Sequence, residues 1–133
     1  MRFQKSYTDI WELIQVEINR GDIFYVDLGE KTEETNVQSG IRPALILSND
    51  KCNEYSPVVI VSPLTSKMKR KDLPVHIKLT RDKENGLEFN SIVLLEQIIT
   101  IDRVKIINKV GSICEEDLEN VNKGLEISLG LKY

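Results

Sequence analysis

The sequence predicts a mainly β fold with flanking helices: a small curved antiparallel sheet or SH3-like barrel, with one helix before it and one after it. Short apolar segments of strand length recur through the middle of the chain and are separated by polar turns. Helical spacing of apolar residues appears only near the two ends. The 133 residues contain no repeat or linker, which suits one domain of ordinary size.

The first helix is expected at residues 6–19, where Ser6 or Thr8 can cap its start and Gly21 follows its end. Its apolar residues recur near helical spacing: Ile10, Trp11, Leu13, Ile14 and Ile18. We therefore divide the chain into an N-terminal helical extension, residues 1–19, and a main domain, residues 20–133.

The strands are expected at residues 23–28, 43–48, 57–62, 73–79 and 91–101. Residues 49–50 and 53–56 are expected as turns, and residues 63–66 as the end of the third strand. A short helix and a last strand are expected between residues 104 and 113. The polar stretch from residue 29 to residue 40 is longer than most connections, and such loops are often functional lids.

The last helix is expected from Glu115 onward, because Leu118, Val121, Leu125 and Leu129 form an apolar stripe. The carboxylates that lead it suit the positive N-terminal end of a helix. Gly124 lowers its helix propensity without excluding it.

Composition indicates a cytoplasmic protein with free thiols, since no apolar run approaches a membrane span and Cys52 and Cys114 lack metal or redox spacing. The net charge of −3 argues against a protein that coats nucleic acid non-specifically. Four cations are nevertheless gathered in five residues: Lys67, Lys69, Arg70 and Lys71. This basic segment is either a phosphate contact or a solvated turn.

Most familiar hydrolase designs are excluded or unsupported by the sequence. The chain has one histidine, His76, which is expected on the polar face of its strand. No cluster has metal-ligand spacing, no glycine-rich loop suits a nucleotide, and no nucleophile elbow is present. We expect neither a metal nor a cofactor.

One constellation remains, at the ends of two apolar strands. Arg42 lies at the entry to one strand, and Thr65 and Ser66 lie at the exit of the next. If the two strands are antiparallel neighbours, these side chains share one end of the sheet with the basic segment. A guanidinium, hydroxyls and lysines at one rim are typical of an anion or nucleic-acid site. By position alone, Arg42 also suits a solvated or surface-paired arginine.

Four segments, in order and spacing, resemble the MazF/PemK toxins of bacterial toxin–antitoxin systems: RGDIFYVDL (20–28), GIRPALILSND (40–50), LPVHI (73–77) and VLLEQIITID (93–102). The similarity spans roughly residues 19 to 131. It implies a homodimeric, curved β-barrel-like fold shared with the CcdB toxins. It also implies a metal-independent endoribonuclease that cleaves single-stranded RNA at short sequences by attack of the 2′-hydroxyl. A cognate antitoxin would hold it silent by covering the basic rim with an acidic tail.

The resemblance assigns catalysis to Arg42, in the GxRP motif, and to Thr65, which ends the strand before the basic segment. It places Ser39, Ser66, His76 and Gln97 where relatives present polar groups to RNA. The basic segment adds Lys67, Lys69 and Arg70 as expected RNA-binding residues.

The loop before Arg42 departs from the family pattern. Many relatives carry a glutamate five residues before the arginine, where this chain has Val37, which cannot accept a proton. Either Glu33 or Glu34 replaces it, or the base is dispensable, or activity is altered. The alternatives to an endoribonuclease are a MazF-like module that binds RNA or protein without cleavage, and a CcdB-like gyrase poison. The poison needs a C-terminal helix surface for its target rather than the two catalytic residues.

Overall fold

The computed structural model describes residues 17–67 and 72–132. Their strands form one seven-stranded sheet in which every pairing is antiparallel. The strands are β1 (Asp22–Asp27), β2 (Ile41–Ile46), β3 (Val58–Thr65), β4 (His76–Leu79), β5 (Ser91–Leu94), β6 (Ile99–Asp102) and β7 (Ile106–Ser112). The helices are α2 (Asp50–Tyr55), the 3-10 helix η1 (Arg103–Lys105) and α3 (Glu115–Ser128). The predicted mainly β class with a C-terminal helix is confirmed.

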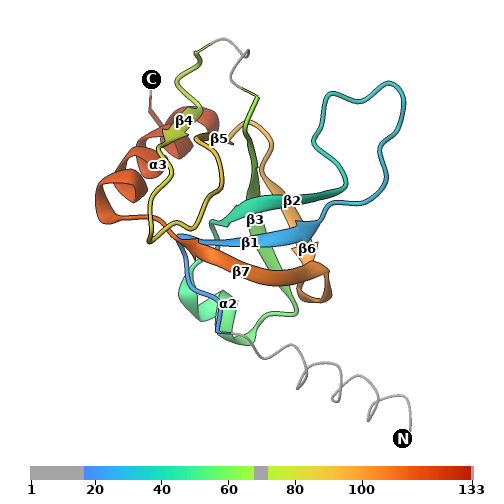
Figure 1. Cartoon of the computed structure of the whole chain (residues 1–133). Helices are drawn as coiled ribbons and strands as arrows, with labels where there is room; N and C mark the ends of the chain where they lie inside the picture. The colour runs from blue at the N-terminus through green and yellow to red at the C-terminus, as the bar shows by residue number, and fades with distance from the viewer. Residues whose placement is uncertain (1–16, 68–71, 133) are drawn as a thin grey trace, which may run out of the picture.

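Strand β3 gives the sheet its curvature. The order is β4-β5-β3-β2-β1-β7, and β6 also pairs with β3. One edge of β3 pairs with β6 through Val58–Val61 and then with β5 through Leu64 and Thr65. The sheet therefore divides at this edge, with β6 on one side of the division and the β4–β5 pair beside α3 on the other (Figure 1).

Two apolar cores lie on the two faces of the sheet, because successive side chains of a strand point to opposite faces. One core contains Phe24, Val26, Ala44, Ile46, Val59, Val61, Ile101 and Ile106. The other contains Ile23, Leu45, Leu64, Leu79, Val93 and Leu95, together with Val121 of α3. Burial on both faces explains why the central strands read as continuous apolar runs.

The structure corrects several predicted boundaries. The single strand expected at residues 91–101 is two strands, β5 and β6, separated by residues 95–98. The fourth strand begins at His76 rather than at residue 73, because residues 74–75 form a turn closed by the His76 N–H to the Leu73 carbonyl (2.9 Å). The third strand, which was expected at residues 57–62, continues to Thr65. Pro63 lies where the edge of β3 passes from β6 to β5, so its missing N–H costs no ladder bond.

The expected turns at residues 49–50 and 53–56 are instead parts of one helix, α2, with Asn49 and Ser56 as its caps. The Asn49 side chain caps this helix by accepting a hydrogen bond from the Cys52 N–H (2.9 Å). Asn53, which is fully buried, anchors it through a bond from Nδ2 to the Ser48 carbonyl (2.8 Å). The predicted short helix and last strand before α3 are confirmed as η1 and β7.

The predicted N-terminal helix lies almost entirely outside the described residues. Residues 17–19, which belong to its expected end, are not helical. The extension as a separate unit, residues 1–19, stays a prediction. None of the helices in the described part of the chain is long and apolar enough to cross a membrane.

Candidate active site

Arg42 and Thr65 lie at the same end of neighbouring strands. Arg42 is the second residue of β2, and Thr65 is the last residue of β3. The two strands are antiparallel with Ala44 opposite Pro63, and Arg42 and Thr65 each lie two residues beyond this pair, toward the same end of the sheet. The structure therefore brings together the two residues that strand order and the family resemblance both singled out.

The Arg42 guanidinium is held on one side and open on the other. Its Nε donates a hydrogen bond to the Ser39 carbonyl (2.8 Å), which ties it to the end of the preceding loop. No hydrogen bond or ion pair joins its two terminal nitrogens to another described residue. Because arginine presents a planar fork of donors, the open side can receive a phosphate.

The Thr65 hydroxyl is oriented by the chain that follows it. Its Oγ1 accepts from the Lys67 N–H (3.2 Å), which leaves the hydroxyl hydrogen to be donated elsewhere. Thr65 is only 3% exposed, so an RNA phosphate must pack directly against the end of β3 to accept from this hydroxyl. Ser66 and Lys67 are exposed beside it. Lys69 and Arg70, the other predicted RNA-binding cations, lie outside the described residues.

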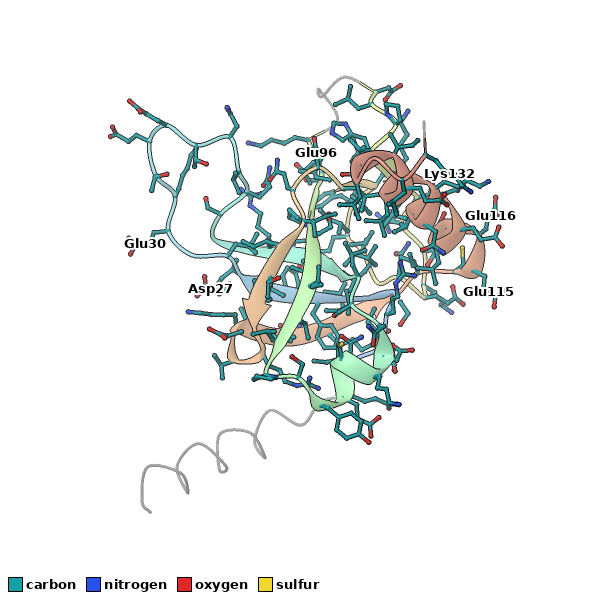
Figure 2. All side chains as sticks on the ribbon, turned by 180° about the vertical axis from the view of Figure 1, so that it is seen from behind. Asp27, Glu30, Glu96, Glu115, Glu116 and Lys132 are labelled. Atoms are coloured by element: carbon teal, nitrogen blue, oxygen red, sulfur yellow. The ribbon has the colours of Figure 1, made fainter. Side chains whose placement is uncertain are left out.

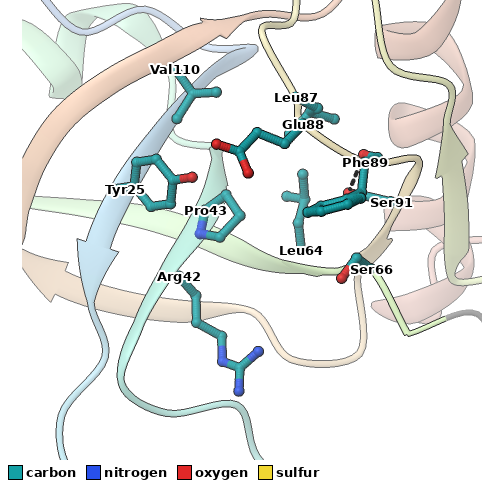
Figure 3. Close-up of a pocket in the computed structure, with 10 residues that line it drawn as sticks. All are labelled: Tyr25, Arg42, Pro43, Leu64, Ser66, Leu87, Glu88, Phe89, Ser91 and Val110. Atoms are coloured by element: carbon teal, nitrogen blue, oxygen red, sulfur yellow. Dashed lines mark hydrogen bonds between the residues drawn. The ribbon is translucent and has the colours of Figure 1, made fainter.

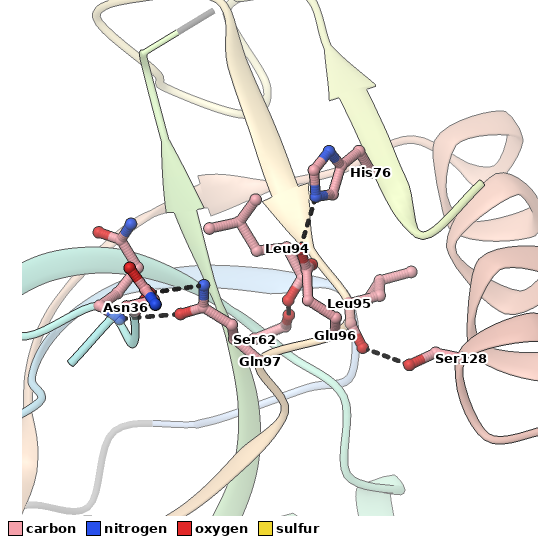
Figure 4. A network of polar contacts seen from close by, with 9 residues as sticks. Asn36, Ser62, His76, Leu94, Leu95, Glu96, Gln97 and Ser128 are labelled. Carbon is pink, nitrogen blue, oxygen red and sulfur yellow. Dashed lines mark hydrogen bonds and ion pairs between the residues drawn. The ribbon is translucent and has the colours of Figure 1, made fainter. Parts of the chain in front are cut away.

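The loop before Arg42 is closed at its base and tied near its end. At the base, the Leu28 N–H donates to the Gly40 carbonyl (2.9 Å) and the Gly40 N–H to the Gly29 carbonyl (2.7 Å). Near its end, Gln97 accepts from the Gln38 N–H (2.8 Å) and donates to the Asn36 carbonyl (3.3 Å), as Figure 4 shows. Val37, between these two attachments, is 54% exposed.

The alternation of its strand predicts that His76 faces solvent, whereas the structure buries its side chain. Its side chain is 4% exposed, and its Nε2 lies 2.6 Å from Oε2 of Glu96 (Figure 4). The backbone next to Glu96 is fixed as well, since Ser62 Oγ donates to the Leu94 carbonyl (2.5 Å) and Ser128 Oγ to the Leu95 carbonyl (2.7 Å). The turn that carries Glu96 and Gln97 is thus a fixed support between β4 and the loop.

A pocket of about 150 Å³ opens beside Arg42 (Figure 3). Apolar groups of Pro43, Leu64, Leu87 and Val110 line it, together with Tyr25, Phe89, Glu88, Ser66 and Ser91. Sequence reasoning did not single out Tyr25, Glu88 or Phe89. The available signal was an acidic residue followed by an aromatic one, shortly after the Asn85-Gly86 turn.

Acidic groups also lie at two other places on the molecule. Asp27 and Glu30 lie on the side of the long loop, and Glu115 and Glu116 begin α3 on the opposite side of the molecule (Figure 2). In the described ranges, no three His, Cys, Asp or Glu side chains gather where they could hold a metal ion.

Comparison with known proteins gives concordant results. Residues 19–129 match the model of the family described as the PemK-like, MazF-like toxin of type II toxin–antitoxin systems. The chain is 36% identical over 114 residues to the endoribonuclease EndoA of Bacillus subtilis, covering 86% of this chain and 96% of that protein. It is also 36% identical over 114 residues to the endoribonuclease MazF of Staphylococcus saprophyticus, covering 86% of this chain and 92% of that protein.

Solved structures resemble the fold as well. A crystal structure of MazF from Deinococcus radiodurans superposes with a TM-score of 0.71 at 22% identity, over 87% of this chain and 99% of that one. A mycobacterial endoribonuclease in complex with its cognate antitoxin gives a TM-score of 0.70 at 22% identity, over 87% and 98% of the two chains.

Proposed function

The chain belongs to the family of PemK-like, MazF-like toxins of type II toxin–antitoxin systems, and we propose that it is a sequence-specific endoribonuclease acting on single-stranded RNA. Two relatives that are 36% identical over most of both chains are named endoribonucleases. The observation that carries the proposal is the Arg42 guanidinium, fixed through Nε and open at its terminal nitrogens, at the same end of the sheet as Thr65.

The reaction proposed is cleavage by the RNA's own 2′-hydroxyl. The 2′-oxygen attacks the adjacent phosphorus and loses its proton to a base, while the bond to the 5′-oxygen breaks and that oxygen is protonated. The products are a 2′,3′-cyclic phosphate and a 5′-hydroxyl. Negative charge accumulates on the phosphorane oxygens, where a preorganised donor is worth roughly a hundredfold or more in rate. The open nitrogens of Arg42 and the hydroxyl of Thr65 are the donors we assign.

Arg42 stabilises charge and is no base, because an arginine side chain stays protonated in proteins. The loop offers no carboxylate at Val37, and its nearest glutamates, Glu33 and Glu34, are exposed. A base drawn from these two, or a reaction that needs none, are the alternatives. No metal is assigned a role in this scheme.

We assign direct RNA contact to Ser39, Ser66, Lys67, Lys69 and Arg70, which flank the catalytic pair in the sequence. His76 and Gln97 are assigned a positioning role instead. Their polar atoms bond Glu96 and the loop before Arg42, and these bonds are the role we assign to them.

We also propose a homodimer regulated by a cognate antitoxin whose acidic segment covers the cationic rim. Large apolar side chains exposed on several strands suit burial between subunits, including Ile41, Ile60 and Ile107. Solved structures of similar fold include MazE–MazF complexes from Deinococcus radiodurans. Light scattering of the purified protein gives its subunit number, and a mass of one chain would contradict the dimer.

The experiment that tests this function is incubation of the protein with long single-stranded RNA in EDTA. We expect cleavage at a short recurring sequence, with 2′,3′-cyclic phosphate ends, and loss of cleavage in Arg42→Ala and Thr65→Ala. Lys51→Ala, which removes an exposed cation on α2, is the matched control and should cleave normally. RNA that stays intact but bound would support the non-cleaving binding module instead.

A further inference from the structure

The pocket beside Arg42 carries opposite charges at its two ends. Figure 3 shows the Glu88 carboxylate directed into the pocket toward Tyr25 and Pro43, while Arg42 lies at the other end. No hydrogen bond or ion pair joins this carboxylate to another described residue, Arg42 included. A ligand that bridges the two would be anionic where it meets Arg42 and would present N–H donors to Glu88.

The wall that carries Glu88 is fixed by a buried asparagine. Asn85 is 1% exposed, and its Oδ1 accepts from the N–H groups of Asp82 (3.0 Å) and Leu87 (3.1 Å). Its Nδ2 donates to the Thr80 carbonyl (2.8 Å). Because the Asn85 side chain bonds the turn at both ends, the residues that follow it, Glu88 included, are held in one arrangement.

Two glycines allow the segment that carries Glu88 to pack closely against β7. A Cβ added at Gly86 would lie 2.1 Å from the Val110 carbonyl oxygen, and one at Gly111 would lie 2.3 Å from the Glu84 carbonyl oxygen. The Ser112 N–H also donates to the Glu84 carbonyl (2.9 Å). The pocket is therefore built into the fold.

The remaining lining suits a flat ring. Phe89 is 63% exposed at the pocket, and its carbonyl accepts from Ser91 Oγ (2.9 Å), which holds its backbone (Figure 3). Pro43 and Leu64 supply apolar surface. At about 150 Å³ the pocket is smaller than the roughly 300–1,000 Å³ typical of sites that enclose drug-sized ligands. It suits one planar group with the rest of the ligand outside.

We propose that this pocket binds one nucleobase next to the cleaved phosphate and selects a base with an exocyclic amine. With the phosphate on Arg42, the base can enter the pocket, lie against Phe89 and donate its amine hydrogens to the Glu88 carboxylate. Adenine, cytosine and guanine carry such an amine, whereas uracil has none and offers a single N3–H between two carbonyl oxygens that the carboxylate repels. The inference rests on the proposed function for the identity of the ligand, and it adds a specificity-determining residue, Glu88.

The test uses binding, so that it does not depend on cleavage. The probes are 2′-O-methyl homopolymers of A, C and U, which lack the nucleophile, and their affinities are measured by fluorescence anisotropy. The wild-type protein should bind oligo(A) or oligo(C) about tenfold more tightly than oligo(U). In Glu88→Gln this preference should fall to near unity, because the glutamine amide can also donate to a carbonyl.

Two further variants separate reading of the base from other roles. Phe89→Ala should weaken the binding of all three homopolymers alike, by about tenfold, because stacking of a base on an aromatic ring is tolerant of sequence. Glu54→Gln, a matched change on the exposed face of α2, should bind as the wild type does. Equal wild-type affinity for oligo(U), or a preference unchanged in Glu88→Gln, would overturn the proposal. If the wild type cleaves no RNA but keeps its binding preference, the proposed function alone would be overturned.

Discussion

Gln97, in the turn between β5 and β6, holds the backbone of Gln38, in the loop that leads to Arg42. The Gln97 Oε1 accepts from the Gln38 N–H at 2.8 Å, and its Nε2 donates to the Asn36 carbonyl at 3.3 Å (Figure 4). Arg42 itself is bonded to Ser39, one residue further along. One side chain thus supports the segment that orients the proposed catalytic guanidinium.

Replacement of Gln97 by alanine should loosen this loop without unfolding the domain. Both hydrogen bonds are lost, and each is worth roughly 0.5–1.5 kcal/mol. We expect faster amide hydrogen exchange at residues 36–39, slower cleavage, and a melting temperature lowered by several degrees in a protein that still folds. Gln97→Glu keeps the acceptor for Gln38 and should protect that amide more than alanine does. Exchange at residues 36–39 unchanged by alanine would contradict this role.

Arg42→Lys tests whether geometry, and not charge alone, matters at the site. Lysine keeps the positive charge but has neither the Nε that bonds Ser39 nor the planar fork. Single-turnover cleavage should slow by about a hundredfold, with RNA affinity changed far less. Lys67→Ala should have the opposite effect. It should lower the affinity for RNA and the dependence of that affinity on salt, while the cleavage rate at saturating RNA stays near normal. A full rate in Arg42→Lys would leave Arg42 as only a binding cation.

Gly111→Ala should destabilise the protein by at least about 2 kcal/mol. The new Cβ would lie 2.3–2.5 Å from backbone atoms of Glu84 and Asn85, which cannot move aside as a flexible side chain can. Urea unfolding gives the loss as a lower midpoint at unchanged slope. Asn108→Ala, at an exposed position of β7, should have little effect. A midpoint for Gly111→Ala equal to that of Asn108→Ala would contradict the close contact.

Arg103→Leu should cost about 2–4 kcal/mol of stability, because the buried guanidinium satisfies carbonyl groups of the α2 segment. Arg103 is 7% exposed, and its Nη1 donates to the carbonyl oxygens of Asn53 and Ser56. Desolvation lowers the pKa of Arg103, so burial of the charge itself opposes folding. The group stays protonated near neutrality, so the loss should not vary between about pH 6 and pH 8. Lys105→Leu, on the exposed side of η1, is the control for urea unfolding.

The parts of the fold that sequence predicted are those governed by local pattern. Ile23 and Leu45 pack on one face while Phe24 and Ala44 pack on the other, as a period of two requires. Antiparallel order alone then put Arg42 and Thr65 at one end of the sheet.

The parts that sequence missed depend on distant partners. The end of helix α2 is tied to Arg103, fifty residues away in the chain, whose guanidinium donates to the Asn53 carbonyl. His76 turns inward because Glu96 of another segment receives it. Glu88 reaches the pocket because Gly86 allows close contact with Val110. None of these pairings leaves a periodic signal in the sequence.

The loop between Asn36 and Gln38 also allows a test of the missing base. Val37 lies between two attached residues, and its N–H is bonded to Thr35 Oγ1 (3.1 Å), so its backbone is fixed. Its side chain is 54% exposed, so replacement costs little stability. Val37→Glu restores the carboxylate that the family pattern places there, and a positioned general base typically contributes a hundredfold or more.

We therefore expect Val37→Glu to cleave RNA at least about tenfold faster than the wild type in single-turnover experiments. The gain should disappear as pH falls through about 4–5, where an exposed glutamate becomes protonated and can no longer accept the 2′-hydroxyl proton. Val37→Gln matches the glutamate in size but cannot serve as a base, so it should keep the wild-type rate at every pH. Equal rates for the Glu and Gln variants would mean that this position does not supply the base. The alternatives would then be Glu33, Glu34 or a reaction without a base.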